Sequence, residues 1–183
     1  YGKGSEFTFN AFFSSAQESS NTVEPLQSLI GLKALLVDDS ESARMVLTEM
    51  LSSLGFTVIV AKDAYEAIDI FEVEQKSTHP LSLMVVDWKM PGMDGLQLVR
   101  ELRAKEGVEV PSILMVTAYG IESMREAAKQ KLVDGVLLKP ITLSNLHDSL
   151  HGIMHTDNHK KTTEKFDFTS IEGFKLALEG SRV

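Results

Sequence analysis

The chain has no cysteine, few prolines and no apolar run near the length that spans a bilayer. Without thiols it forms no disulfide, which fits a reducing compartment such as the cytoplasm. A membrane-spanning helix needs about 20 consecutive apolar residues, so we expect no direct membrane contact from this sequence. Basic residues are also in deficit, 18 against 26 acidic ones, for a net charge of -8. Such a balance argues against a nucleic-acid partner, because phosphates would be repelled.

What the sequence does contain is enough apolar material for a packed core. Hydrophobic residues make up 43% of the 183 positions, which predicts one domain of ordinary size with flanking segments. We place that domain at 31–156. The segment 14–30, rich in Ser, Asn, Gln and Glu, is predicted to be a linker, and polar residues follow the domain from 157 onward.

Five short apolar segments alternate with segments of helical period. The strands are predicted at 34–37, 57–61, 83–86, 113–116 and 136–138, and the helices at 40–54, from 63 onward, at 95–103, 121–130 and 142–154. Gly55 is placed to end the first helix, and Asp63 with Glu66 predicts a capping box at the start of the second. This alternation predicts an α/β fold, a doubly wound five-stranded parallel sheet of flavodoxin-like order 2-1-3-4-5 with helices on both faces.

Polar residues directly follow four of the five strands. Asp38 and Asp39 follow the first, Asp87 the third, Thr117 the fourth and Lys139 the fifth. Singly, each has a structural explanation, since Asp often caps helices or occupies turns. Jointly, they predict a binding site, because the carboxyl ends of parallel strands meet at one edge of the sheet.

The three acids at this edge predict a metal ion. The first and third strands are neighbours in the predicted order, so Asp38, Asp39 and Asp87 would crowd together and repel one another. A hard divalent cation relieves that repulsion, and a few carboxylates with retained water suit Mg²⁺ better than Ca²⁺.

Four strings in this order resemble the receiver domain of two-component response regulators across residues 31–156. They are Leu36-Val37-Asp38-Asp39-Ser40, Val86-Asp87-Trp88-Lys89-Met90-Pro91-Gly92-Met93-Asp94-Gly95, Val116-Thr117-Ala118-Tyr119-Gly120 and Leu138-Lys139-Pro140. The resemblance implies a phosphoacceptor that takes a phosphoryl group from phosphohistidine, on a histidine-kinase dimerisation domain or a histidine phosphotransfer domain. It also implies that the domain promotes its own phosphorylation and dephosphorylation without a kinase active site.

The same resemblance implies a role for each site residue. Asp87 would be the phosphorylated residue, and Mg²⁺ would be held by Asp39, Asp87 and the backbone carbonyl of Lys89. Asp38 would act on the metal through water. Thr117 and Lys139 would bind phosphoryl oxygens, Thr117 reporting phosphorylation as a switch, with a cis peptide bond before Pro140. One departure stands out, since Val136 occupies the position where the family often has an aromatic partner for the threonine.

Three other features of the sequence suggest different functions. A haloacid-dehalogenase-type phosphatase also forms an aspartyl phosphate, but it needs a nucleophile after the first strand and a second acid two positions later, where this chain has Ser40. A receiver used only for protein contacts would not need all five site residues. Four histidines spaced by four, His147, His151, His155 and His159, could line a helix as metal ligands, but a solvated helix face is favoured.

The flanks predict a larger parent protein. Residues 1–13, with Gly2-Lys3-Gly4-Ser5-Glu6-Phe7, resemble the closing segment and last strand of a histidine-kinase ATP-binding domain, although Gly-Ser-Glu-Phe is also a common cloning remnant. At the other end, Gly180-Ser181-Arg182-Val183 repeats the small, basic, apolar pattern of Gly31-Leu32-Lys33-Ala34. We therefore expect 157–183 to lead into a second receiver, this domain being the first receiver of a hybrid histidine kinase. Such a parent could be membrane-anchored, with this part in the cytoplasm.

Overall fold

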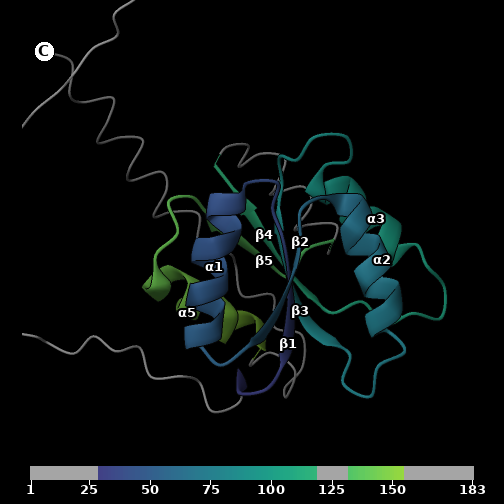
Figure 1. The fold of residues 1–183 in the computed structure, drawn as a ribbon, viewed down its shortest axis with the longest axis horizontal. Coiled ribbons are helices and arrows are strands. Elements are labelled where there is room, and N and C mark those ends of the chain that lie inside the picture. The colour runs from purple at the N-terminus through teal and green to yellow at the C-terminus, as the bar shows by residue number, and fades with distance from the viewer. Residues whose placement is uncertain (1–28, 119–131, 155–183) are drawn as a thin grey trace, which may run out of the picture.

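A parallel sheet lies between two pairs of helices (Figure 1). The computed structural model describes residues 29–118 and 132–154. The strands are β1 (Lys33–Val37), β2 (Thr57–Ala61), β3 (Leu81–Asp87), β4 (Ser112–Thr117) and β5 (Gly135–Leu138), and the helices are α1 (Glu41–Ser53), α2 (Ala64–Glu74), α3 (Gly95–Arg103) and α5 (Leu143–Met154). All pairings are parallel, in the order β2-β1-β3-β4-β5. The predicted fold class and strand order are confirmed.

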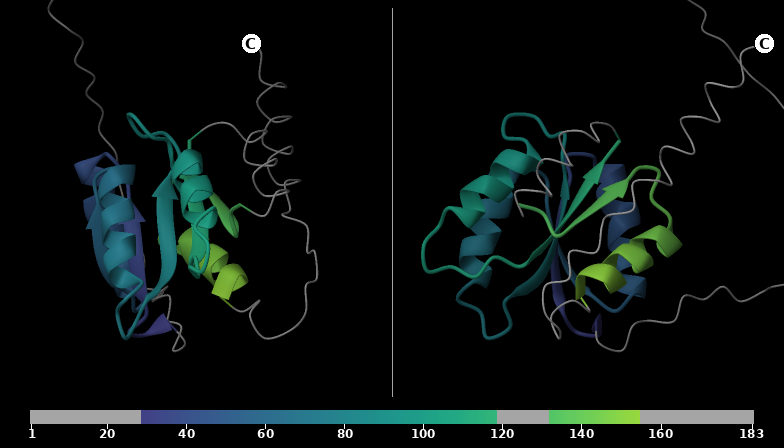
Figure 2. Two further views of the ribbon diagram at one scale, coloured as in Figure 1. Left: turned by 90° about the vertical axis from the view of Figure 1, so that its right-hand side faces the viewer. Right: turned by 180° about the vertical axis from the view of Figure 1, so that it is seen from behind.

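The two faces of the sheet carry separate hydrophobic clusters. Leu35, Met84 and Ile113 belong to a cluster with buried residues of α2 and α3, whereas neighbours such as Leu36 and Leu114 belong to a cluster with α1 and α5. Successive side chains of a strand point to opposite faces, so strands covered on both sides are apolar throughout. The view from behind shows the same layers, with the sheet between the helix pairs (Figure 2).

β2 departs from this pattern because it is an edge strand. Its partner in the sheet is β1 alone, and Val60 is 44% exposed. At the start of the described chain, Leu29 is buried among residues of α1 and β2, so apolar packing begins before β1.

The helix termini follow local sequence signals. Gly55 has a φ of +105° directly after the C-cap of α1, as expected of a C′ glycine. Asp63 accepts a hydrogen bond from the Glu66 N–H, as predicted, but the Glu66 carboxylate accepts from the N–H of Lys62 rather than from that of Asp63. The reciprocal capping box is instead formed by Asp94 and Gln97 at the start of α3.

Several predicted features lie outside the described residues. They are the strand within 1–13, most of the linker 14–30, the helix at 121–130, His155 and His159, and the segment 157–183. Within the described ranges, no helix combines the length and apolar character needed to cross a membrane.

Candidate functional site

The polar residues that follow the strands meet at the carboxyl edge of the sheet. Asp38 directly follows β1, Asp87 is the last residue of β3, Thr117 ends β4 and Lys139 directly follows β5. The strand pairing explains the convergence, since Val37 pairs with Val86 and Thr117 pairs with Leu138. The sheet therefore presents these side chains on one rim.

Three carboxylates form a compact acidic group on this rim. One oxygen each from Asp38, Asp39 and Asp87 lies within 4.8 Å of the other two. Asp38 is 1% exposed and Asp87 6%, whereas Asp39 is exposed to solvent. Two of the negative charges are thus removed from water while the third faces it, and the repulsion among them calls for positive charge nearby.

Lys139 supplies part of that charge. Its Nζ lies 2.7 Å from Asp87 Oδ1 and 3.3 Å from Asp38 Oδ2, bridging the two buried acids. The backbone N–H of Lys139 donates to the carbonyl of Thr117 over 2.8 Å, and the Lys139–Pro140 peptide bond is cis. These contacts fix the lysine over the carboxyl end of β3.

Asp38 is held from several directions. Its backbone N–H donates to the carbonyl of Ala61 over 3.3 Å, and its own carbonyl accepts from Arg44 Nη1 over 2.7 Å. Its Oδ1 accepts from the backbone N–H of Ser40 over 2.8 Å, while Oδ2 faces Lys139. Both carboxylate oxygens of Asp38 are therefore engaged within the protein. The contribution of Arg44 was missed from sequence, since an arginine on an amphipathic helix carries no signal for a carbonyl six residues earlier.

The electrostatics of Asp87 and Lys139 reflect this crowding. Burial raises the pKa of Asp87 most, the charge of Asp38 raises it further, and the bonds to Lys139 and to the backbone of Lys89 only partly offset these effects. For Lys139, burial is the largest single influence and lowers the pKa, but the bonds and charges of Asp87 and Asp38 together outweigh it and raise the pKa. The acid is destabilised as an anion, and the lysine is stabilised as a cation.

The backbone around Asp87 is packed against the start of α3. The N–H of Gly95 donates to the carbonyl of Trp88, and the backbone N–H of Trp88 donates to the carbonyl of Val116. A Cβ at position 95 would lie 2.3 Å from the Asp87 carbonyl oxygen. Only glycine permits this close approach, so Gly95 sets the position of the strand end that carries Asp87.

The acidic group fits Mg²⁺ by its chemistry. Three carboxylates with oxygens within 4.8 Å of one another, one of them open to solvent, offer the hard oxygen ligands that Mg²⁺ takes while it keeps several waters. In the two described ranges, no other group of three or more His, Asp or Glu side chains is arranged to hold a metal. The histidine series does not form one there: His147 is half-buried beside Asp148, and His151 is exposed.

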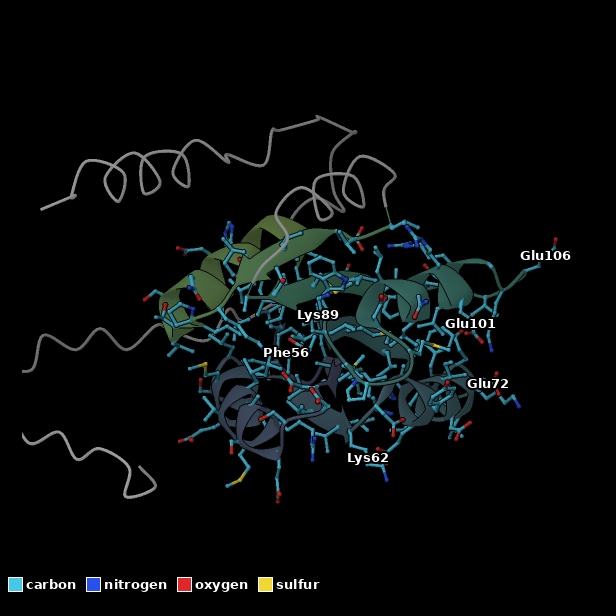
Figure 3. All side chains as sticks on the ribbon, turned by 90° about the horizontal axis from the view of Figure 1, so that it is seen from above. Phe56, Lys62, Glu72, Lys89, Glu101 and Glu106 are labelled. Carbon is cyan, nitrogen blue, oxygen red and sulfur yellow. The ribbon has the colours of Figure 1, made fainter. Side chains whose placement is uncertain are left out.

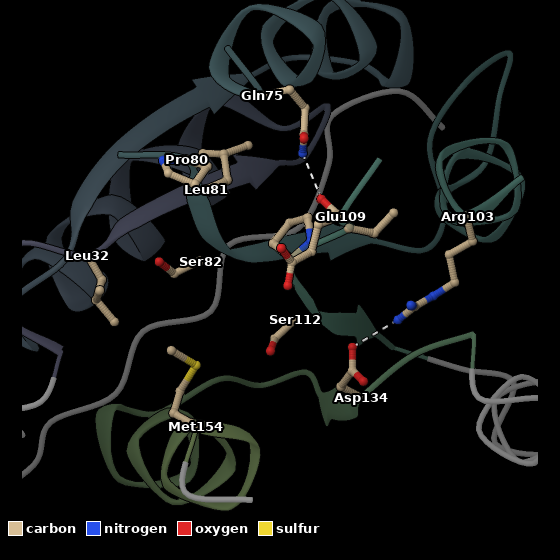
Figure 4. A pocket seen from close by; sticks show the side chains of 12 residues that line it. Leu32, Gln75, Pro80, Leu81, Ser82, Arg103, Glu109, Ser112, Asp134 and Met154 are labelled. Atoms are coloured by element: carbon tan, nitrogen blue, oxygen red, sulfur yellow. Dashed lines mark hydrogen bonds and ion pairs between the residues drawn. The ribbon is translucent and has the colours of Figure 1, made fainter. Parts of the chain in front are cut away.

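Several acidic side chains of α2, of α3 and of the loop after α3 lie away from this rim (Figure 3). Seen from above, Glu72 and Glu101 lie on the outer side of α2 and α3, and Glu106 lies farther out. All three are well separated from Lys89 (Figure 3). A groove of about 670 Å³ lies at the opposite, amino-terminal end of the strands, and its lining includes Ser82, Ser112 and the ion pair of Arg103 with Asp134 (Figure 4). None of the predicted site residues lines this groove.

Comparison with known proteins gives the family. The model of the response regulator receiver domain matches residues 34–151. The chemotaxis protein CheY homolog of Campylobacter jejuni is 31% identical over 134 residues, which are 73% of this chain and 100% of that protein. Chemotaxis protein CheY of Pseudomonas aeruginosa is 33% identical over 128 residues, 69% of this chain and 99% of that protein.

A solved structure agrees with this assignment. The receiver domain of a sensor histidine kinase from Pseudomonas aeruginosa, which has a magnesium ion coordinated in its active site cleft, is 27% identical with a TM-score of 0.56. The match covers 68% of this chain and 98% of that domain. These similarities favour the receiver over the phosphatase alternative. The chain belongs to the response regulator receiver domain family of two-component signalling, whose role is to accept a phosphoryl group on an aspartate with Mg²⁺.

Proposed function

We propose that Asp87 is the residue of this chain that accepts the phosphoryl group. The observation that carries the proposal is that a lysine and two further acids converge on Asp87. Asp87 Oδ1 lies 2.7 Å from Lys139 Nζ, and a carboxylate oxygen of Asp87 lies within 4.8 Å of oxygens of Asp38 and Asp39. Asp38 is a weaker candidate, since both its oxygens are bound within the protein. Asp39 is exposed and lies outside the lysine contact.

The transfer is a substitution at phosphorus. A carboxylate oxygen of Asp87 attacks the phosphorus of a phosphohistidine, an O–P bond forms, and the P–N bond breaks with its electron pair returning to the imidazole. Such transfers depend mainly on positioning and charge stabilisation. The raised pKa of Asp87 marks a carboxylate whose negative charge is poorly compensated before a cation binds.

Mg²⁺ would be held by Asp39, Asp87 and the backbone carbonyl of Lys89, with Asp38 acting through a water molecule. A bound Mg²⁺ supplies positive charge that offsets the charge of the transferring phosphoryl group. Asp38 suits an indirect role because Ser40 and Lys139 already occupy its oxygens. The magnesium ion in the similar sensor-kinase receiver supports this choice of metal.

Lys139 and Thr117 would bind the oxygens of the phosphoryl group. The Lys139 ammonium already contacts Asp87, so a small movement would bring it to an oxygen of the phosphoryl group. There it would donate a charge-assisted hydrogen bond. Thr117 is 1% exposed at the end of β4, and its hydroxyl would report phosphorylation to the surface.

The partner would be a phosphohistidine domain, either a histidine-kinase dimerisation domain or a histidine phosphotransfer domain. We further infer that the chain is the first receiver of a hybrid histidine kinase. Residues 1–13 would close the ATP-binding domain, 14–30 would be a linker, and 157–183 would lead into a second receiver. The parent would keep this domain in the cytoplasm. The sequence of the parent on either side is the direct test, and an unrelated continuation after Val183 would contradict the tandem arrangement.

Intact-mass spectrometry with acetyl phosphate tests the assignment of Asp87. Wild-type protein should gain one phosphoryl adduct in the presence of Mg²⁺ and no adduct when EDTA is added beforehand. Asp87→Asn should gain none. Asp69→Asn is the matched control, since it makes the same chemical change at an exposed position of α2 and should be labelled like wild type. Equal labelling of Asp87→Asn would overturn the assignment.

A further inference from the structure

We propose that Arg44 is a positioning residue that sets the direction of Asp39 as a metal ligand. Arg44 Nη1 donates to the carbonyl oxygen of Asp38 over 2.7 Å. That oxygen belongs to the peptide group that joins Asp38 to Asp39, so the bond fixes the plane from which Asp39 extends. The inference rests on the proposed function of the acidic group as a Mg²⁺ site.

The short connection between β1 and α1 shows why this bond is needed. At one end, the N–H of Ser40 donates to Asp38 Oδ1, and at the other the backbone N–H of Arg44 donates to the carbonyl of Ser40. Asp39 lies between these anchors. In the described part of the chain its carboxylate makes no hydrogen bond or ion pair, and it faces solvent. With no hydrogen bond or ion pair from the described residues to orient its carboxylate, the direction of Asp39 depends on the peptide group before it.

Arg44 acts on this peptide group from the first turn of α1. It belongs to a helix whose N-cap, Ser40, accepts from the N–H of Ala43. Its side chain is half-buried and turns back over the connection to reach Asp38. A ligand is held accurately when the group behind it is fixed by hydrogen bonds from a rigid element, and the Arg44 contact has this form.

The alternative is that Arg44 matters only through its charge. Its contact is with a carbonyl, and in the described residues it forms no ion pair with a carboxylate. The two explanations predict opposite changes in Mg²⁺ affinity when the Arg44 guanidinium is removed. A nearby positive charge repels Mg²⁺, so its removal alone would tighten Mg²⁺ binding, whereas loss of the positioning bond would weaken it. A purely structural role would lower stability and leave the Mg²⁺ affinity of the folded protein unchanged.

The experiment is a calorimetric titration of the full chain with Mg²⁺ at fixed ionic strength. Arg44→Met keeps much of the aliphatic stem but removes the donors and the charge, and Arg44→Lys keeps the charge and a donor group on a shorter side chain. We expect Arg44→Met to bind Mg²⁺ about 10-fold more weakly, the loss typical of a residue that supports a metal ligand. Arg44→Lys should lie between it and wild type. Arg100→Met, an exposed arginine of α3, is the matched control and should bind within about 2-fold of wild type.

A double-mutant cycle shows whether Arg44 acts through Asp39. In an Asp39→Asn background, Arg44→Met should cause no further loss of Mg²⁺ affinity, because the ligand it positions is gone. Unchanged or tighter binding by Arg44→Met, in protein shown folded by circular dichroism, would overturn the proposal, and so would an undiminished effect in the Asp39→Asn background. Failure of the Mg²⁺ site itself would look different, since wild type and Asp39→Asn would then titrate alike.

Discussion

Lys139 Nζ lies 2.7 Å from Asp87 Oδ1, so the lysine pairs with the proposed nucleophile before any phosphoryl group arrives. The same ammonium lies 3.3 Å from Asp38 Oδ2. The lysine therefore offsets part of the repulsion between two buried acids in the resting protein, and it is already beside the atom where new negative charge would appear. One side chain would serve both the stability of the site and its reaction.

Removal of this ammonium should separate the two roles. Lys139→Ala should bind Mg²⁺ at least as tightly as wild type, because a competing positive charge is lost, yet take a phosphoryl group from acetyl phosphate about 100-fold more slowly, as when one transition-state donor is removed. Stopped-flow fluorescence of Trp88, which is the single tryptophan and adjoins Asp87, would follow both processes. Lys62→Ala, at an exposed lysine, is the control. An unchanged phosphorylation rate in Lys139→Ala would contradict the role.

The raised pKa of Asp87 gives a pH dependence with a definite sign. Burial and the charge of Asp38 raise this pKa, so the metal-free folded protein binds more protons than the unfolded chain in the acidic range. The contribution of Asp87 to the free energy of unfolding should then fall as the pH rises from the ordinary aspartate pKa through the raised value. Asp87→Asn cannot ionise, so its stability advantage over wild type should grow across the same interval. Urea unfolding in EDTA at a series of pH values measures this difference, and a constant or shrinking difference would count against it.

A pair of glycine substitutions tests how closely α3 is packed on the site. A Cβ at Gly95 would lie 2.3 Å from the Asp87 carbonyl oxygen and 2.9 Å from a Val86 methyl, while a Cβ at Gly152 in α5 would meet nothing within 4 Å. Gly95→Ala should destabilise the fold by about 1–3 kcal/mol through overpacking. Gly152→Ala should stabilise it by roughly 0.5–1 kcal/mol, because it restricts the unfolded chain and favours helix. Equal effects in denaturant unfolding would show that the approach of α3 to Asp87 is not constrained.

Val136 predicts a limited response to phosphorylation. It is half-buried against the cluster that contains Met115, its neighbour in β4, and a β-branched side chain is restricted at χ1. It cannot swing between buried and exposed positions as an aromatic ring can. Beryllofluoride with Mg²⁺, a mimic of the aspartyl phosphate, should therefore shift the methyl resonances of Val136 only slightly and leave the protein's sedimentation unchanged. Strong new dimerisation on adding beryllofluoride would refute this view.

The sheet and its rim follow from the sequence because their causes are local or topological. Strands covered on both faces are uniformly apolar, and parallel strands bring their carboxyl ends together, so Asp38, Asp87 and Lys139 could be predicted to meet. The contact between Arg44 and the carbonyl of Asp38 could not, because a long side chain can reach many acceptors and no periodicity selects one.

The helix termini show a similar limit. The Asp63 cap was predicted from spacing, but the choice of the Glu66 carboxylate between two neighbouring N–H groups depends on the backbone path before α2. The capping box of Asp94 and Gln97 has the same spacing, and Asp94 lies within a string that carried the family resemblance. Spacing therefore identified the Asp63 cap, and only the three-dimensional arrangement decided the partner of Glu66.

The most direct test of the central claim is to locate the phosphoryl group. Wild-type protein treated with acetyl phosphate and Mg²⁺ would be reduced with borohydride, which converts an aspartyl phosphate to homoserine, and then digested and sequenced by tandem mass spectrometry. We predict homoserine at position 87 and unmodified aspartate at 38 and 39. Homoserine at 38 or 39, with position 87 unchanged, would contradict the account.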